Sequence, residues 1–467
     1  MKTTKYINKL AIAFAVLFFL ILGAVWYSSY FYTLYWQEGF AFFSSLPDFT
    51  DIQVSLPEDI FKYIGAYLLQ FFRNPLLGAA IQAGFAAFIV ACIGFSIKDI
   101  RLLWMAFIPV PILVAGQYAD IMLERSVLWC SVALLIAIIW GGIRLMKFKV
   151  PSPKLLRSPI LMFGIPLVTL GISIYLLTNK ENEYQEKICQ IDYCANRQEW
   201  PEVLQLIQPQ EAKKDDLKLR YALLALSETG QLADRAFGYG IQDYSQFLFY
   251  GSEDPFSRNF NALFYQALGL SNEVIHQCYQ QCLTSPFGFN FKSLRMLVDT
   301  CLETGDYILA QKYLEILRHS SFHQEWIEDR MEKMGNIKKE DKPETKEEIP
   351  FVGNFLETIT SLVNQDQTNK KQMDLCLCAI LTTRNAEYFH QAFQIAGPIF
   401  YINAQRIPRH YEEALLLIAL RDKNILSQYN ISQESKARFA DFMQLYQNGR
   451  INAAKAKYPE SYWSFVF

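Results

Sequence analysis

Three carboxylates stand where an enzyme working at a membrane surface would need them. Glu38 follows the first apolar segment, and Asp120 and Glu124 lie four residues apart just beyond the third. Two side chains at this spacing share one face of a helix. Paired acids in such a position can act as general bases on an acceptor.

A transferase acting on a lipid-linked substrate is one hypothesis for these acids, because multi-pass enzymes that use polyprenyl-linked sugars place catalytic acids in outer loops. Two considerations weigh against it. Outer loops are where acidic residues are tolerated in any membrane protein, and the five crossings predicted below are fewer than such enzymes usually have. We therefore favour a structural origin for the acids.

Cysteine and histidine form no recognisable metal or nucleophile site. Cys278 and Cys282 with nearby His276 are the closest cluster, but zinc needs a second ligand pair at a recognised spacing. Several of the nine cysteines fall on apolar helix stripes, where cysteine packs as a small hydrophobe. The five histidines form no HExxH, and GxSxG, GxxxxGK[ST] and GxGxxG are missing. We predict no cofactor, no metal and, on balance, no catalysis.

The elements that position these residues are predicted membrane helices, and the stretch 144–178 shows the pattern most clearly. It opens with a basic segment, and then Pro159 to Leu177 contains no charged residue, enough to cross a bilayer core of about 30 Å as a helix. Pro109 and Pro111 should kink the third of the earlier apolar segments. The predicted membrane helices span about 10–32, 76–97, 102–122, 127–146 and 158–178.

Basic residues set the orientation of these helices. If the N-terminus is cytoplasmic, the outer loops receive only Lys62, Arg73 and Arg125. The cytoplasmic side then receives Lys2, Lys5, Lys9, Lys98, Arg101, Arg144, Lys147, Lys149, Lys154 and Arg157. Five crossings place everything after Thr178 outside the cytoplasm.

A long outer loop, 35–74, is rich in aromatic and acidic residues. Its second part, from Pro57 to Phe72, has apolar residues at helical intervals, which predicts an amphipathic helix lying on the membrane interface. We favour a structural collar for this loop. A substrate-binding lip is the alternative.

After Thr178 the pattern becomes one of short amphipathic helices in pairs. The clearest unit, 294–317, fits the tetratricopeptide pattern: Gly305 makes the turn, and Ala310 is the small residue at the helix crossing. The predicted buried stripe of this unit comprises Leu294, Leu297, Val298, Cys301, Leu314 and Leu317. Fainter copies have their predicted turns at Gly230, Gly269, Asn385 and Gly449.

The predicted fold is therefore all-α, with a five-helix membrane domain followed by an α-solenoid. The membrane domain covers residues 1–178, and the first part of the solenoid covers 179–336. Residues 337–350 form a highly charged linker, and 351–467 form a second helical-repeat part.

Three segments carry a resemblance. Residues 69–78 (LQFFRNPLLG), 222–234 (ALLALSETGQLAD) and 461–465 (SYWSF) are similar to a family of bacterial polytopic membrane proteins with helical-repeat tails. The likeness covers most of the chain. It implies a bacterial inner membrane with the repeats in the periplasm. No activity is established for that family, so the resemblance assigns no catalytic residue.

Composition agrees with a binding role in a membrane setting. Hydrophobic residues make up 52% and charged residues 19% of the chain, and a net charge of −2 gives no reason to expect a nucleic-acid partner. Because helical solenoids form concave recognition surfaces, we predict a scaffold that binds a protein or peptide in the periplasm. Lys292 and Arg295, which flank the Leu294 stripe, are the predicted partner-binding residues.

Overall fold

The computed structural model describes residues 2–47, 50–51, 54–97, 99–145, 158–252, 254–320, 322–336, 350–401 and 406–467. Within these ranges the regular structure is helical and contains no strand, as predicted. The chain divides into two compact units. Unit 1 holds Met1–Gln190 and Tyr279–Lys342, and unit 2 holds Ile191–Cys278 and Pro343–Phe467. Apart from Pro350, the predicted charged linker lies outside the described residues.

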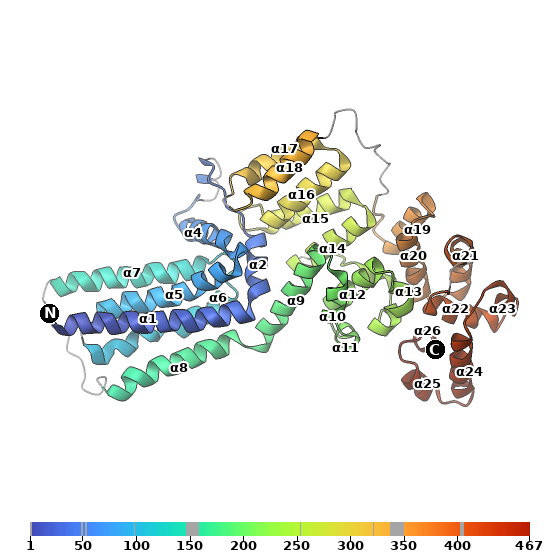
Figure 1. Ribbon diagram of the computed structural model, residues 1–467, viewed down its shortest axis with the longest axis horizontal. Helices are drawn as coiled ribbons and strands as arrows, with labels where there is room; N and C mark the ends of the chain where they lie inside the picture. Colours follow the sequence, from blue (N-terminus) through green and yellow to red (C-terminus); the bar gives the residue numbers. More distant parts are fainter. Residues whose placement is uncertain are drawn as a thin grey trace. The chain divides into compact units, whose positions relative to one another are not determined.

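Unit 1 contains a bundle of apolar helices that run alongside one another (Figure 1). Among the described residues, four helices are long and apolar enough to cross a membrane, so the expectation of a membrane protein is supported. The bundle comprises α1 (Lys2–Ser29), α5 (Pro75–Ser96), η2 (Ile100–Phe107), α6 (Pro109–Gln117), α7 (Glu124–Leu145) and α8 (Pro159–Leu177).

The third predicted span, 102–122, differs from the continuous helix that we expected. It consists of the 3₁₀ helix η2 followed by the short helix α6, which ends at Gln117. Pro109 and Pro111 occupy the first turn of α6, where a missing backbone N–H is tolerated. They cannot donate to a helix running through them, so the chain starts a new helix there. In the part of the chain that the structure describes, the count of long apolar helices is therefore four rather than five.

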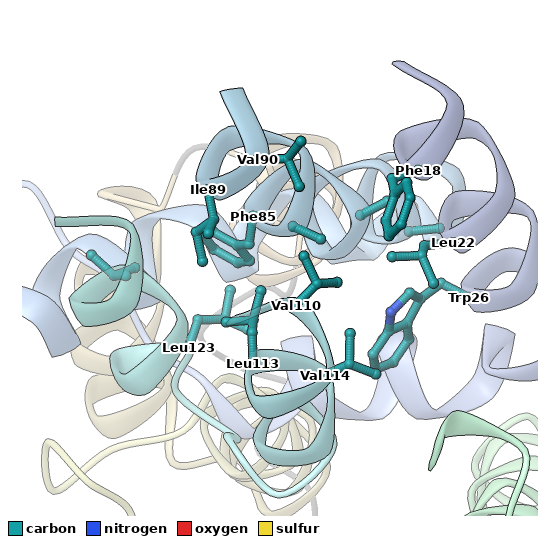
Figure 2. Close-up of a cluster of buried hydrophobic side chains, with 14 of the residues drawn as sticks. Phe18, Leu22, Trp26, Phe85, Ile89, Val90, Val110, Leu113, Val114 and Leu123 are labelled. Carbon is teal, nitrogen blue, oxygen red and sulfur yellow. The ribbon is translucent and has the colours of Figure 1, made fainter. Parts of the chain in front are cut away.

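The core of the bundle combines large and small side chains. Phe18, Leu22 and Trp26 of α1 share one buried cluster with residues of α5 and α6, including Ile89 and Val110 (Figure 2). Small residues let α1 and α5 approach closely. A Cβ added to Gly94 would stand 2.9 Å from Cβ of Ala11, the kind of contact that drives helix association in membranes.

Shorter elements stand between α1 and α5 in the chain: α2 (Phe31–Phe40), α4 (Asp59–Leu69) and the 3₁₀ helix η1 (Gln70–Arg73). Helix α4 matches the predicted amphipathic helix, and it exposes an apolar stripe of Ile60, Ile64 and Tyr67. Its other face meets the turn before α7 at Gly65. A Cβ on Gly65 would lie only 1.9 Å from the carbonyl oxygen of Met122.

Unit 1 also includes three helices from the predicted solenoid: α16 (Phe291–Thr304), α17 (Tyr307–Arg318) and α18 (Gln324–Asn336). The predicted stripe of 294–317 is buried, Ala310 is fully buried, and Gly305 ends α16 with φ +78°. The amide of Phe291 donates to the carbonyl oxygen of Ala41, 3.1 Å away. This contact with the residue that follows α2 helps explain why these helices group with unit 1 and not with the later ones.

Unit 2 is built around two buried helices. Every residue of α12 (Asp216–Glu228) from Lys218 to Ser227, and of α20 (Lys370–Thr382) from Gln372 to Thr382, is buried. A helix that is buried on all sides lies inside a packed core. The remaining elements of unit 2 are α10 (Trp200–Leu206), α11 (Pro209–Ala212), α13 (Leu232–Arg235), η4 (Ala236–Tyr239), η5 (Tyr244–Phe247), α14 (Pro255–Leu268), α19 (Phe355–Gln365), α21 (Ala386–Ala396), the π-helical η6 (Gly397–Tyr401), α22 (Arg409–Ala419), α23 (Ile425–Gln428), α24 (Gln433–Gln447), α25 (Ile451–Lys457) and α26 (Tyr462–Val466). The divisions between the units fall within α9 (Lys180–Asn196) and α15 (Ser271–Thr284).

The predicted turn residues are mostly correct. Gly230, Gly269 and Gly449 all have positive φ. Asn385 is the exception, because the left-handed residue is its neighbour Arg384 at φ +59°. Asn385 instead caps α21, with its side-chain oxygen accepting a hydrogen bond from the amide of Tyr388 at 3.0 Å.

Candidate functional site

Unit 2 contains a cavity of about 490 Å³, a volume typical of small-ligand sites. Buried apolar residues contribute to its lining, among them Leu219 and Phe237. Three cations, Lys213, Arg384 and Lys455, also line it. We call this cavity the basic pocket.

Local backbone geometry positions the first of these cations. Lys213 follows α11, and Asp215 then caps α12 by accepting hydrogen bonds from the amides of Leu217 at 3.0 Å and Lys218 at 3.1 Å. Gly240 stands beside Lys213 with φ +92°, and a Cβ there would lie 2.6 Å from Cγ of Lys213. Any residue other than glycine at position 240 would therefore displace the side chain of Lys213.

Arg384 occupies a strained backbone conformation. Its φ of +59° is rare for a residue with a side chain and costs on the order of 1–2 kcal/mol. Such strain persists where the surrounding structure enforces it, which is common at binding sites. The guanidinium carbon lies 4.6 Å from the ring centroid of Phe465, a cation–π contact on a residue that also lines the pocket.

The basic pocket has an excess of positive charge. Among the described residues, Lys213, Arg384 and Lys455 make no side-chain ion pair. The carboxylate of Asp216, which also lines the cavity, lies 3.4 Å from Nη1 of Arg220. The pocket therefore suits an anionic group, such as a carboxylate, combined with an apolar side chain.

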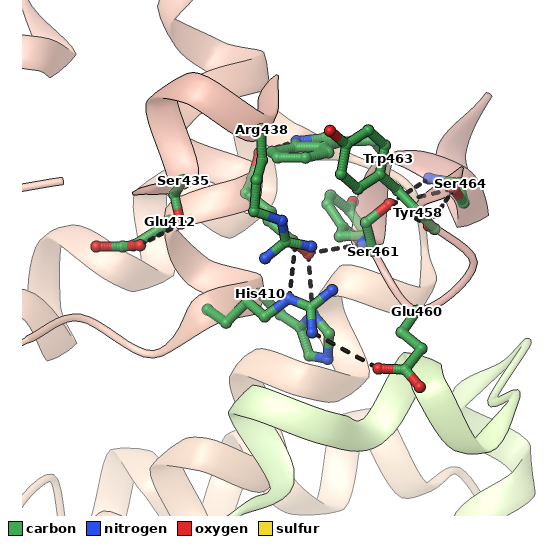
Figure 3. A network of polar contacts seen from close by, with 12 residues as sticks. His410, Glu412, Ser435, Arg438, Tyr458, Glu460, Ser461, Trp463 and Ser464 are labelled. Atoms are coloured by element: carbon green, nitrogen blue, oxygen red, sulfur yellow. Dashed lines mark hydrogen bonds and ion pairs between the residues drawn. The ribbon is translucent and has the colours of Figure 1, made fainter. Parts of the chain in front are cut away.

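A buried glutamate holds the C-terminal wall of the pocket. Glu413 accepts a hydrogen bond from the amide of Tyr462 at 2.7 Å, and its Oε2 lies 3.0 Å from Nδ1 of His410. Figure 3 shows the polar network to which His410 and Trp463 belong. Nε1 of Trp463 donates to the backbone carbonyl of Glu413 at 2.8 Å. Burial alone would raise the pKa of Glu413, but His410 and Arg409 outweigh it and hold that pKa below its usual value. The glutamate thereby fixes α26, which supplies Ser464 and Phe465 to the pocket.

Glu38, the first predicted acid, is buried in unit 1. It is 6% exposed and its Oε1 lies 2.5 Å from Nε2 of His323, which is 5% exposed and 285 residues away in sequence. On the other side of the imidazole, Nη1 of Arg73 lies 2.7 Å from Nδ1, and it also donates to the carbonyl oxygen of Phe322. Arg73, His323 and Glu38 thus form a continuous chain.

The partners of His323 define its protonation. A guanidinium can only donate, so Nδ1 of His323 accepts from Arg73 and the ring proton resides on Nε2, which donates to Glu38. Burial lowers the pKa of His323, and the hydrogen bond with Glu38 only partly opposes this. The ring also stacks on Phe291, with centroids 3.4 Å apart. His323 is therefore a neutral, fixed imidazole near pH 7.

The space beside Glu38 is too small for a substrate. Glu38, Gln70 and Ser320 help line a cavity of about 10 Å³. A single water molecule needs roughly 10–15 Å³. In this conformation Glu38 cannot contact an acceptor, so its geometry is that of a structural contact.

Asp120 and Glu124 do not form the pair that their spacing suggested. Asp120 lies in the turn after α6, whereas Glu124 is the first residue of α7, so no helix carries both. The Oδ2 atom of Asp120 accepts hydrogen bonds from the amide of Ser126 at 2.8 Å and from its hydroxyl at 3.0 Å. The buried aspartate therefore stabilises the start of α7. The expectation of a shared helical face is wrong because the helix ends before Asp120.

Lys292 and Arg295 lie on α16 but not on a freely exposed surface. The guanidinium of Arg295 is 4.7 Å from the ring centroid of Trp326, and burial lowers its pKa. Cβ of Lys292 lies 3.6 Å from where a Cβ of Gly39 would stand, so α16 approaches α2 here. Both residues thus face neighbouring helices of unit 1, and their role in partner binding stays a prediction.

The cysteines form no disulfide, and all but Cys130 are buried. This agrees with the interpretation that most of them fill space in the core. No group of three or more ligand-type side chains among the described residues could hold a metal ion.

Comparison with known proteins places the chain in a family. The sequence matches a family of unknown function (DUF6057) over residues 5–177 and 153–467. The chain belongs to this family. No match was found among curated proteins or among solved structures. The DUF6057 match covers the membrane helices, the Arg73–His323–Glu38 chain and the basic pocket alike.

Sequence reasoning found parts of both sites but neither site as a whole. Glu38 was singled out, yet nothing in the sequence pairs it with His323. In the basic pocket, 461–465 stands out in the sequence only as a segment of resemblance, and three of its residues, Ser461, Ser464 and Phe465, line the cavity. Lys213, Arg384 and Lys455 are ordinary surface-type residues far apart in sequence, so no local pattern could have joined them.

Proposed function

We propose that this DUF6057 protein is a membrane-anchored recognition protein whose basic pocket binds a protein or peptide partner through an acidic side chain or a terminal carboxylate. The observation that carries the proposal is the set of three unpaired cations around a cavity with apolar residues in its lining. An extended peptide could place an anionic group among the cations and an adjacent apolar side chain against Leu219 and Phe237. A lipid bilayer is the second partner, and nucleic acid is not expected.

The same proposal places unit 2 in the periplasm of a bacterium, with the anchor in the inner membrane. Eight residues of η2 at about 2.0 Å each and nine of α6 at about 1.5 Å each extend roughly 30 Å. That is about the thickness of the hydrocarbon core. We therefore propose that η2 and α6 together make the fifth crossing. With the excess of basic residues inside, five crossings put the later helices outside.

We also propose that the helices after α8 derive from tetratricopeptide-like pairs. The support is local: left-handed glycines end helices at Gly269 and Gly305, and a small buried residue, Ala310, lies on the helix that follows Gly305. The burial of α12 and α20 on all sides departs from a simple two-layer solenoid, in which each helix keeps an exposed face.

The transferase is the weaker proposal. Asp120 is occupied as a cap of α7, and Glu38 is sealed against His323 beside a cavity of about 10 Å³. The observation in its favour is the Glu38–His323 hydrogen bond, an arrangement that can serve general-base catalysis. Loss of function on Glu38→Gln without loss of folding would favour this alternative.

The test of the recognition proposal uses the full-length protein in native membranes. Partners would be captured by crosslinking from cells carrying wild type, Lys213→Glu, Lys455→Glu or the control Lys214→Glu. Lys214 is exposed, next to Lys213 in sequence, and is not part of the pocket lining. We expect each pocket variant to lose a specific partner that the control keeps.

Peptides derived from a captured partner would then be measured against the purified protein. Binding should weaken at least about tenfold when the acidic group is amidated, since a charge-assisted pair is lost. Equal capture by wild type and by both pocket variants would refute the proposal. Equal affinity for acidic and amidated peptides would refute recognition of an anionic group by the pocket.

A further inference from the structure

Unit 1 has another cavity at the start of a membrane-crossing helix. Its volume is about 350 Å³, and it lies where η1 passes into α5. Leu76 and Leu77, in the first turn of α5, are 59% and 44% exposed, as side chains facing lipid would be. Since the apolar span begins here, the cavity lies at the level of the lipid headgroups whichever way the protein is oriented. We call it the interfacial pocket.

Arg73 gives this pocket its charge. Its Nη1 is engaged by His323 and by the carbonyl oxygen of Phe322. Its Nε and Nη2 have no hydrogen-bond acceptor, and Arg73 has no ion pair, within the part of the chain that the structure describes. A guanidinium presents several donors in a rigid fork suited to phosphate. Two of its three nitrogens thus remain available to a ligand.

The buried Glu38–His323 pair orients the side chain of Arg73 in this pocket. Glu38 accepts the Nε2 proton of His323 and so leaves Nδ1 as an acceptor for Arg73. A pair that reaches no substrate thereby holds one nitrogen of a surface arginine in place. Because a fixed guanidinium loses little entropy on binding, this arrangement preorganises a phosphate ligand.

The other walls of the pocket are apolar. Phe71 and Phe322 pack edge to face with centroids 4.9 Å apart, and Leu77 lines the cavity beside them. Aromatic residues commonly lie at the headgroup level of a membrane. A free phosphate ion would use Arg73 but would leave these walls unoccupied, whereas a lipid would use both.

We propose that the interfacial pocket binds the headgroup phosphate of an anionic glycerophospholipid, with Arg73 as the ligating residue and His323 and Glu38 as positioning residues. The glycerol and the first acyl carbons then lie against Phe71, Phe322 and Leu77. The site is separate from the basic pocket and does not depend on the function proposed above.

The test measures lipid retention by native mass spectrometry on the detergent-purified full-length protein. Phosphatidylglycerol is titrated against wild type, Arg73→Gln, Arg73→Lys and the control Arg125→Gln, which alters an exposed arginine near the start of another membrane helix, α7. We expect Arg73→Gln to weaken binding roughly five- to tenfold and Arg125→Gln to leave it unchanged. Arg73→Lys, which keeps the charge but not the fork, should be intermediate.

Each alternative has its own outcome. Equal retention of phosphatidylglycerol by wild type and Arg73→Gln overturns the proposal. Retention of phosphatidylcholine by wild type as strong as its retention of phosphatidylglycerol also overturns it. Displacement of the lipid by millimolar inorganic phosphate would show a free-anion site and would overturn the lipid assignment. For His323→Gln we expect a lower ratio of phosphatidylglycerol to phosphatidylcholine with total lipid unchanged. A fall in both lipids together would make His323 merely structural.

Discussion

At the scale of single residues, buried charged groups in this protein are used to hold neighbouring elements. Glu38 fixes His323, Glu413 fixes α26, and Asp120 caps α7. Their residue types made two of them candidates for chemistry in the sequence. In the structure these carboxylates are buried and hydrogen-bonded. Spacing along the chain does not reveal this, because His323 is 285 residues from Glu38 and Tyr462 is 49 residues from Glu413.

Replacement of Glu413 should destabilise unit 2 strongly. Glu413→Gln removes the charge that Arg409 and His410 face, and breaking a buried pair in this way costs about 3 kcal/mol. Glu460→Gln, which removes a half-exposed carboxylate 3.7 Å from Arg409, should cost less than about 1 kcal/mol. The midpoints of thermal unfolding of the two variants would decide. Similar midpoints would mean that Glu413 does not anchor α26.

The pKa of Glu413 also predicts an acid sensitivity. Because this pKa is lower in the folded protein than in the unfolded chain, the stabilisation is complete above the unfolded value, about 4.3. It is lost as the pH falls through the lower, folded value. The stability difference between wild type and Glu413→Gln should therefore shrink below about pH 4. A difference that stays constant down to pH 3 would contradict the assignment.

His323 should make unit 1 sensitive to a different pH range. Its pKa is lowered by burial, so below about pH 6.5 the unfolded chain takes up a proton more readily than the folded one. The stability contributed by the neutral ring is complete above that pH and falls as the pH is lowered. Wild type should thus lose its advantage over His323→Gln between pH 7.5 and 5.5, by up to about 1.4 kcal/mol per pH unit.

The measurement is thermal unfolding of the full-length protein in detergent at both pH values. His319→Gln controls for removal of an imidazole outside the Arg73–His323–Glu38 chain. If wild type and His323→Gln respond identically to pH, the ring is not buried in the neutral form described above.

At the scale of elements, boundaries set by strong local signals were predicted well. Helix α5 (Pro75–Ser96) and helix α8 (Pro159–Leu177) agree with the predicted spans to within a residue, because Asn74-Pro75 and Ser158-Pro159 combine a capping side chain with proline at N1. The third span failed where two prolines interrupt an apolar run. Hydropathy alone does not distinguish one long helix from a 3₁₀ helix joined to a short α-helix.

Helix α4 depends on a glycine for its position. Gly65→Ala should destabilise the protein by about 1–3 kcal/mol, because the new Cβ would overlap the carbonyl oxygen of Met122 and the backbone there cannot yield easily. The matched control is Gly84→Ala in α5, where a Cβ meets nothing within 4 Å. That change should be neutral or stabilising by less than about 1 kcal/mol. If both variants unfold at the temperature of wild type, α4 does not pack as described.

At the scale of the whole molecule, the number of crossings decides where unit 2 lies. Five crossings place the two ends of the membrane domain on opposite sides, whereas four place them on the same side. We expect a reporter fused after Phe467 to be active only in a periplasmic form, and one fused near Ser152 only in a cytoplasmic form. A cytoplasmically active reporter after Phe467 would refute both the fifth crossing and the periplasmic partner.

The division into units is the part of the architecture that the sequence concealed most fully. The predicted boundaries at 178 and 336 divide the chain into consecutive domains. Unit 1 instead includes a second, separate segment, Tyr279–Lys342, from the middle of the helical half. In sequence, the amphipathic patterns of α16, α17 and α18 do not differ from those of the other short helices. What groups them with unit 1 is contact with distant residues, such as the hydrogen bond from Phe291 to Ala41 and the chain through His323.

That interleaving has a consequence for the time at which the basic pocket forms. During translation, the residues around Lys213 and Phe237 are synthesised first. The segment Tyr279–Lys342, which belongs to unit 1, comes next, and Ser464 and Phe465 follow only much later. At about 5–20 residues per second, this delay is on the order of tens of seconds. Throughout it, Leu219 and Phe237 lack the wall that α26 provides. The nascent chain therefore exposes an apolar, partly formed groove to which chaperones can bind, and synthesis of the last helix ends that exposure.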